Sequence, residues 1–158
     1  MTPSKAAAAP RHSTDLPVPL DAAADALVRC AQEACRQHER VAKLAERRAH
    51  HTEMGEATEM CELVHRHLRE RTSLYETSAA GGRGKHNDDF WHAANALWHA
   101  SRDYARRHTS CDSAHATMLK HSSEKLGELQ LENEFEASAL LALRTAISGY
   151  RKLRPAAD

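Results

Sequence analysis

The most constraining feature of the sequence is a run of apolar residues at alternating steps of three and four, extending from Phe90 to Tyr150. The positions on this stripe are Phe90, Ala94, Leu97, Ser101, Tyr104, His108, Cys111, His115, Leu119, Ser122, Leu126, Leu129, Asn133, Glu136, Leu140, Leu143, Ile147 and Tyr150. Only a helix places side chains at this spacing on one face. We therefore expect an all-α chain.

Two shorter apolar stripes precede this run and predict two further helices. The first helix is expected to begin near Leu20, with Asp21 as its N-cap, and to end at about His50. The second stripe, from Ala57 to Tyr75, is out of phase with the first. A turn between His50 and Gly55 is therefore expected.

A glycine-rich segment marks the clearest loop. Residues 80–86 read Ala-Gly-Gly-Arg-Gly-Lys-His, which is unfavourable in a helix, and Asn87 is then expected to cap the third helix. Weak helix formers from Thr109 to Ser113 favour another turn near Ser110. The predicted fold is an antiparallel up-down four-helix bundle with a long last helix. If that turn is absent, the alternative is a long two-helix hairpin that dimerises.

The length of 158 residues is typical of one domain. We expect a disordered Ala/Pro-rich tail over residues 1–19, a helical bundle over 20–152 and a C-terminal tail over 153–158. Aromatic residues are only 4% of the chain, so we expect helices that pack closely through small side chains.

The charge balance argues against some classes of partner. Lysine plus arginine equals aspartate plus glutamate at 22 each, so the net charge attracts neither nucleic acid nor an anionic membrane. No apolar run is long enough to span a bilayer. The four cysteines form no CxxC pair, which favours reduced thiols and a cytoplasmic location.

The last predicted helix carries a second apolar stripe on a different face. It comprises Leu131, Phe135, Ala139 and Ala142, together with Ala146. A helix that is apolar on two sides needs two partners. We therefore expect a homodimer whose interface contains these residues.

Histidine is unusually frequent, at 12 residues of 158. His108, Cys111 and His115 share one helical face, and the predicted fold brings His50 and His51 towards the same end of the bundle. Imidazole and thiolate are ligands that zinc, nickel, cobalt and copper prefer. These five residues therefore form a candidate metal site, with Zn, Ni, Co or Cu as its ion; the alternative is a group of polar residues at a solvated helix end.

Two other histidines lie in patterns that bear on metal binding. Glu62 and His65 have the Glu-x-x-His spacing of ferritin-like di-iron proteins, but Glu62 points away from the face of Val64, so we do not expect a di-iron site. His38 lies on the inward face of the first helix. We expect it to be hydrogen-bonded to a neighbour such as Asn133 or Glu136.

One short segment has a catalytic pattern. The residues Arg102-Asp-Tyr-Ala-Arg-Arg-His108 are similar to the Arg-polar-x4-His signature of the HEPN ribonucleases, which are also small all-helical domains. The resemblance covers only these residues. It implies that Arg102 and His108 would act on RNA without a metal, across a dimer.

Three interpretations of function follow from these patterns. The first is a non-catalytic helical bundle that acts by protein interaction, as a homodimer with a further protein partner that the sequence does not identify. The second is a transition-metal-binding bundle with a His/Cys cluster. The third is a HEPN-like ribonuclease.

Overall fold

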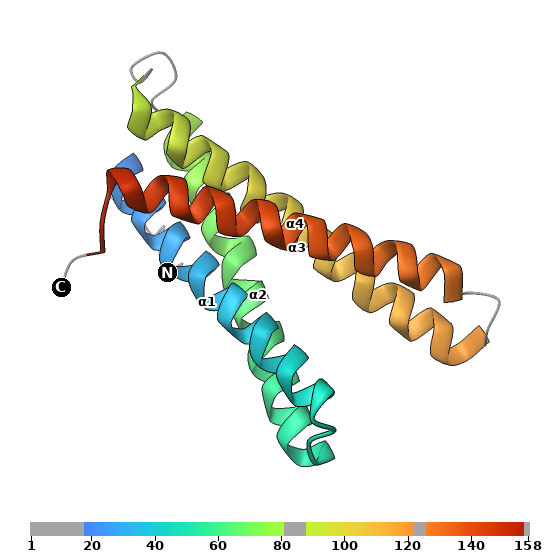
Figure 1. Cartoon of the computed structure of the whole chain (residues 1–158). Helices are drawn as coiled ribbons and strands as arrows, with labels where there is room; N and C mark the ends of the chain where they lie inside the picture. Colours follow the sequence, from blue (N-terminus) through green and yellow to red (C-terminus); the bar gives the residue numbers. More distant parts are fainter. Residues whose placement is uncertain (1–17, 81–87, 122–125, 157–158) are drawn as a thin grey trace, which may run out of the picture.

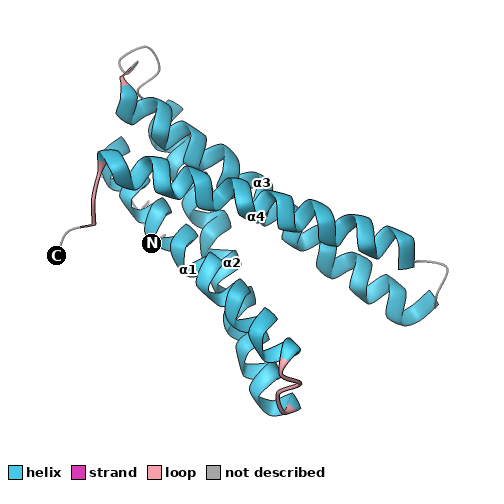
Figure 2. Cartoon of the chain, viewed as in Figure 1, coloured by secondary structure: helices cyan, strands magenta, loops and turns pink. Residues whose placement is uncertain are grey.

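The computed structural model describes residues 18–80, 88–121 and 126–156, and these residues form four α-helices (Figures 1 and 2). The helices are α1 (Leu20–Glu46), α2 (His51–Ala80), α3 (Asp89–His121) and α4 (Leu126–Leu153). No strand occurs in the described ranges. The predicted all-α fold of four helices is confirmed.

The helices are arranged as two antiparallel hairpins, α1–α2 and α3–α4. Figure 1 shows that the hairpins pack against each other where α1 begins and α4 ends, and diverge towards the turns within each hairpin. The turn between α1 and α2 lies far from the outer half of the α3–α4 hairpin (Figure 1). Neighbouring helices are therefore antiparallel, but the four helices do not run together along their full length.

The predicted turn near Ser110 is wrong. Helix α3 continues without interruption to His121, and α4 begins at Leu126. The Thr109 hydroxyl donates to the Ala105 carbonyl (3.1 Å), so this weak helix former is accommodated within the helix, and Cys111 is buried on the continuing apolar face. The last helix has 28 residues against 33 in α3, so it is not the longest, and the two-helix alternative is also wrong.

The helix ends differ from the predicted ones by a few residues. Pro19 occupies the N-cap of α1, and Asp21 lies in its first turn. The turn before α2 comes earlier than expected, because Arg48 adopts a positive φ of 52° just after α1 ends. Asp88 Oδ1 accepts the Trp91 amide (2.8 Å) and caps α3. The predicted cap Asn87, the glycine-rich loop and the tail up to residue 17 lie outside the described residues.

The core lies where the two hairpins meet. Small residues and leucines from all four helices form most of it, and three tyrosines are almost completely buried within it. These are Tyr75, Tyr104 and Tyr150. In the described part of the chain, no helix has an 18-residue stretch apolar enough to cross a membrane.

Candidate metal centre

A group of buried and half-buried polar side chains borders this core, with every helix contributing to it. His38 comes from α1, His65 from α2, Tyr104 and His108 from α3, and Glu136 from α4. Their rings and hydrogen bonds connect them: the His65 ring stacks on the His108 ring with centroids 3.7 Å apart. We call these five residues the polar centre.

The hydrogen bonds of the polar centre have a defined direction. The Cys61 carbonyl can only accept, so His65 Nδ1 donates to it (2.7 Å). A neutral His65 then accepts at Nε2 from the Tyr104 hydroxyl (2.8 Å). The Tyr104 oxygen in turn accepts from His38 Nδ1 (3.0 Å). Tyr104 therefore links the imidazoles of α1 and α2.

Burial determines the protonation states along this chain of hydrogen bonds. It lowers the pKa of His65 to about 4, with a further contribution from nearby His108. Burial also lowers the pKa of His38, although the Glu136 carboxylate opposes that shift. Both imidazoles are thus neutral near pH 7, which is the form that binds metal ions.

Glu136 supplies the negative charge of the polar centre. Its Oε2 accepts from His108 Nδ1 (2.8 Å), and its Oε1 lies 3.9 Å from His38 Nδ1. His108 Nε2 lies 3.4 Å from Asp112 Oδ2 on the outer side. The carboxylate therefore joins α4 to histidines of both α1 and α3.

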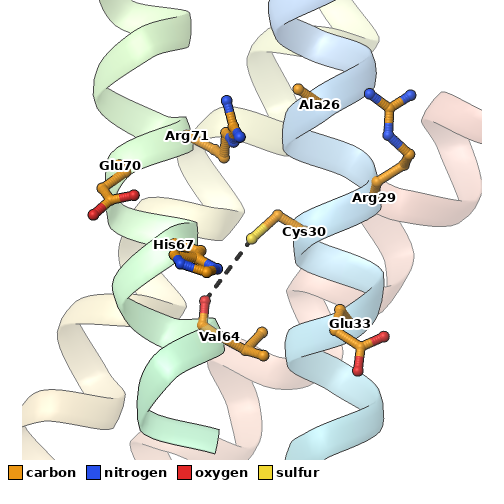
Figure 3. Close-up of a pocket in the computed structure, with 8 residues that line it drawn as sticks. All are labelled: Ala26, Arg29, Cys30, Glu33, Val64, His67, Glu70 and Arg71. Atoms are coloured by element: carbon orange, nitrogen blue, oxygen red, sulfur yellow. Dashed lines mark hydrogen bonds between the residues drawn. The ribbon is translucent and has the colours of Figure 1, made fainter. Parts of the chain in front are cut away.

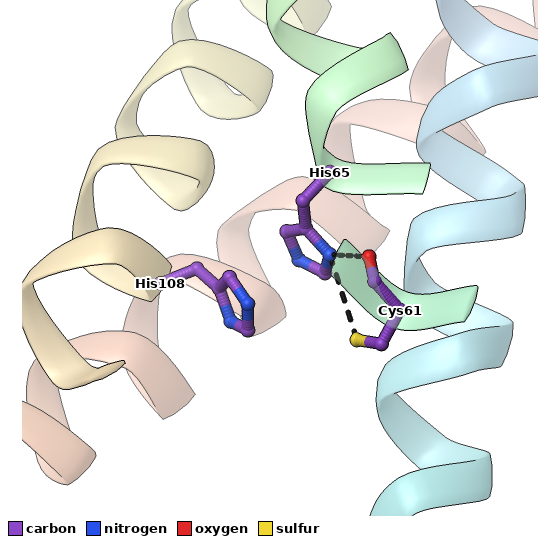
Figure 4. Close-up of side chains that lie close together, drawn as sticks. All are labelled: Cys61, His65 and His108. Atoms are coloured by element: carbon purple, nitrogen blue, oxygen red, sulfur yellow. Dashed lines mark hydrogen bonds between the residues drawn. The ribbon is translucent and has the colours of Figure 1, made fainter. Parts of the chain in front are cut away.

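Two overlapping groups within the described residues have ligand atoms all within 4.8 Å of one another. One contains His38, His108 and Glu136, and the other contains Cys61, His65 and His108 (Figure 4). Figure 4 shows His108 on α3 facing His65 on α2, with Cys61 one turn away on α2. Nitrogen, oxygen and sulfur donors of this kind can hold a transition-metal ion.

The polar centre is accessible from the α2–α3 side. A pocket of about 210 Å³ is lined by both histidines of these helices, His65 and His108, and by polar residues around them. The other lining residues are Glu62, Arg66, Arg69, Thr109 and Asp112. An ion therefore has a route to these imidazoles without separation of the hairpins.

The structure brings only one of the five sequence-predicted ligands into these groups, namely His108. Cys111 is buried and donates from Sγ to Asn133 Oδ1 (2.9 Å). His115 is exposed. The rings of His50 and His51 lie against each other in a tilted arrangement at the turn of the first hairpin, far from the outer half of α3 because the hairpins diverge. The five residues therefore do not form one site.

Four residues of the polar centre, namely His38, His65, Tyr104 and Glu136, were not predicted as metal ligands. Glu136 and Tyr104 both lie on the long apolar stripe. A carboxylate at a predicted core position is the feature of the sequence that could have identified Glu136. Sequence analysis predicts no metal site at Glu62 and His65, because Glu62 points away from the buried face. Glu62 is exposed, as expected, but His65 is only 1% exposed. Its position four residues after Cys61 and three before Leu68 places it on the buried face. His38 lies within ion-pair distance of Glu136, one of the two expected neighbours, although its hydrogen bond is to Tyr104.

The proposed ribonuclease pair occupies two separate environments. Arg102 is exposed, and its guanidinium carbon lies 5.5 Å from the centre of the Trp98 ring. His108 is directed inward to Glu136 and His65. The two side chains thus line different pockets on the α2–α3 side.

The predicted interface residues also separate into two sets. Leu131, Phe135 and Ala142 are exposed on α4, whereas Ala139 is 5% exposed and packs in the core. Ala139 is therefore unable to contribute to an outer contact surface in this fold.

A further groove of about 380 Å³ lies between α1 and α2 (Figure 3). Cys30 Sγ is directed across it to the Val64 carbonyl (3.8 Å). Two arginines and two glutamates, Arg29, Arg71, Glu33 and Glu70, surround the groove and balance in charge. The arginines and glutamates of this groove therefore give no excess of either charge.

Comparison of the chain with protein-family models, with curated proteins and with solved structures finds no match.

Proposed function

We propose that the protein is a non-catalytic helical bundle that binds a divalent transition-metal ion (zinc, nickel, cobalt or copper) through His38, His108 and Glu136. The observation that carries the proposal is the convergence of these ligand atoms, within 4.8 Å of one another, from three different helices. Two imidazoles and a carboxylate form a donor set that such ions prefer.

The hydrogen bonds of the polar centre support this ligand set. An ion there would replace the proton that His108 now donates to Glu136, so that binding releases protons. In a tetrahedral site with metal–ligand distances near 2.1 Å, ligand atoms lie about 3.4 Å apart. Bringing the three groups to that spacing requires only small side-chain movements from their present positions.

The position of the site indicates what the ion would do. His38 belongs to the first hairpin, and His108 and Glu136 belong to the second. An ion bound by all three would connect the hairpins at the point where they meet, and its binding energy would add to the stability of the folded chain. The function supported by this geometry is metal binding that fixes the relative position of the hairpins.

The test is metal analysis of protein purified without a histidine tag, after incubation with each of the four ions and removal of unbound metal. We expect about one ion per chain for at least one of these metals, with a raised midpoint of thermal unfolding. The variants His108→Ala and Glu136→Gln should lose the ion.

The exposed histidines provide matched controls. His115→Ala and His51→Ala remove the same type of side chain outside the polar centre, so both variants should retain the ion. The proposal is wrong if the wild-type chain retains none of the four metals, or if His115→Ala loses metal to the same extent as His108→Ala.

A second candidate function, homodimerisation through α4, is favoured by a separate observation. Leu131 and Phe135, two of the predicted interface residues, are 49% and 38% exposed on this helix. Exposed large apolar side chains on one element are typical of contact surfaces between proteins. A second copy of the chain would cover them, and the mass of the protein in solution tests this.

A further inference from the structure

A second pocket on the α2–α3 side differs from every other groove described above in its charge. It has a volume of about 410 Å³, and three arginines line it: Arg69 from α2, and Arg102 and Arg106 from α3. The remaining lining residues are Thr72, Ser73, Ala105, Thr109 and Ser110. No carboxylate is among them. We call this pocket the arginine groove.

Two of the three arginines have no acidic partner in the described part of the chain. Neither Arg69 nor Arg102 has a carboxylate oxygen within 4.0 Å, whereas Arg106 pairs with Asp103 at 2.8 Å. Arg102 and Arg106 are one helical turn apart and therefore lie on the same side of α3. The arginine groove is thus lined by three arginine side chains from two helices, and two of these have no carboxylate partner among the described residues.

The hydroxyl groups of the arginine groove fall into two kinds. Thr72 and Thr109 donate their hydroxyl hydrogens to the carbonyls of Arg69 (2.7 Å) and Ala105 (3.1 Å). Ser73 of α2 and Ser110 of α3 also line the groove, and a serine hydroxyl can donate to a ligand. The polar groups available to a ligand are therefore the two serine hydroxyls and the arginine side chains that border the groove, and no carboxylate lines it.

We propose that the arginine groove binds the phosphate group of a small phosphorylated molecule. A guanidinium group forms paired hydrogen bonds with a phosphate, and several such groups around one pocket are a common means of recognising it. The volume is within the range of small-molecule sites. The balanced net charge of the whole chain conceals this local excess, whereas the other two grooves described above contain both arginine and acidic residues.

Trp98 provides a reporter for this groove. Arg102 lies over its ring at 5.5 Å, and its Nε1 donates to the carbonyl of Thr72 (3.2 Å). A phosphate that draws Arg102 into the groove should change the fluorescence of Trp98. The chain has two tryptophans, so the variant Trp91→Phe leaves Trp98 as the single emitter.

The experiment titrates inorganic pyrophosphate into the Trp91→Phe chain at constant ionic strength, with chloride as the reference anion. We expect a saturable change in fluorescence and matching heat in calorimetry. Arg69→Gln and Arg102→Gln should each weaken binding in calorimetry by about tenfold or more. Arg36→Gln is the matched control, because Arg36 is exposed on α1 and paired with Glu33, and its affinity should be unchanged.

The titration is repeated with EDTA and with His108→Ala, so that its result does not depend on a metal at the polar centre. Absence of saturable binding at millimolar pyrophosphate would overturn the proposal. Equal loss in Arg36→Gln would do the same, since it would indicate a diffuse charge effect. Binding of single-stranded RNA without binding of pyrophosphate would also overturn it, in favour of a polyanion surface. Circular dichroism of each variant verifies folding.

Discussion

At the scale of single residues, Tyr104 connects the polar centre. Its hydroxyl donates to His65 Nε2 and accepts from His38 Nδ1, and the side chain is fully buried. Burial raises the pKa of Tyr104 far above its usual value, so the hydroxyl keeps its proton at physiological pH. The position of Tyr104 on the apolar stripe indicated a core residue, but its polar role depends on two histidines from other helices.

The variant Tyr104→Phe should therefore destabilise the chain. Removing the hydroxyl leaves one buried acceptor on His65 and one donor on His38 without their partner, at a cost of about 1 to 3 kcal/mol. The measurement is the free energy of unfolding in urea.

Tyr75→Phe is the control for this variant. Tyr75 is also buried, but its hydroxyl has no hydrogen-bond partner among the described residues. Removing that hydroxyl should leave stability unchanged or raise it. If both variants lose the same stability, the loss comes from removing a buried hydroxyl in general, and the hydrogen bonds of Tyr104 do not contribute.

The sequence predicts whether a side chain is buried where the residue's own helix determines that. It does not predict which residues of other helices the side chain contacts. His38 was expected to point inward, and it is more than half buried with Glu136 nearby. Cys111 was expected to share a site with His115, but the two differ in exposure because only Cys111 faces α4. The choice among partners depends on how the hairpins cross, and periodicity along one helix contains no information about that crossing.

At the scale of helices, α1 and α4 are joined near the point where the first begins and the second ends. Asp25 accepts from the Tyr150 hydroxyl (2.5 Å) and from Arg154 Nη2 (2.6 Å). Burial by itself would raise the pKa of Asp25, but these two hydrogen bonds and the charge of Arg154 outweigh it and lower the pKa. The ionised carboxylate is thus the form that stabilises the contact.

Asp25→Asn should lower the free energy of unfolding at pH 7 by about 1 to 2 kcal/mol, because Arg154 is partly exposed and solvent weakens the pair. The folded-state pKa lies below the unfolded one, so the contribution is present above about pH 4 and is lost as the pH falls through the folded-state pKa. Urea denaturation from pH 7 to acid should show the difference between variant and wild type disappearing.

The exposed ion pair of Glu39 and Lys43 on α1 provides a control for Asp25→Asn. Glu39→Gln also removes a carboxylate, but solvent surrounds both partners, so no measurable change is expected at pH 7. A constant difference between Asp25→Asn and wild type at every pH would contradict the role assigned to the ionised carboxylate.

The spacing of apolar residues predicted the number and type of helices, but it did not predict where α3 ends and α4 begins. Residues 109–113 contain Thr, Ser and Asp, which favour turns in isolation, but the buried face passing through Cys111 keeps the segment helical. The actual interruption follows His121, where the sequence also continues with serines. Local propensity was similar at the two places, and packing against α4 decided between them.

At the scale of the whole molecule, the hairpins diverge, so that much of the outer half of α3–α4 lies away from α1 and α2, beyond the contacts that His108 and Glu136 make with the first hairpin (Figure 1). Phe135 there is covered on one side by Arg107, whose guanidinium carbon is 4.6 Å from the ring centre. Leu131, on the same helix, has about half of its surface exposed. This is the surface on which the proposed homodimer depends.

If a second copy covers this surface, the mass in solution should be twice 17.6 kDa. Phe135→Glu should reduce it to the single-chain value, because a charge would be buried in the contact. Light scattering after size exclusion provides the measurement. Met60→Glu, at an exposed position of similar size on α2, should leave the mass unchanged. A wild-type chain with the single-chain mass would rule out the dimer at the concentration used.

Each helix pairs with its neighbour along the chain, and this bears on the order in which the chain folds. The closest partners, α1 with α2 and α3 with α4, are joined by short connections, so most contacts arise between segments close in sequence. Topologies of this kind reach the native state quickly, because little chain entropy is lost before the first stabilising contacts form. Docking of the preformed pairs would then be the late event, and it is the step at which His38 first meets Glu136.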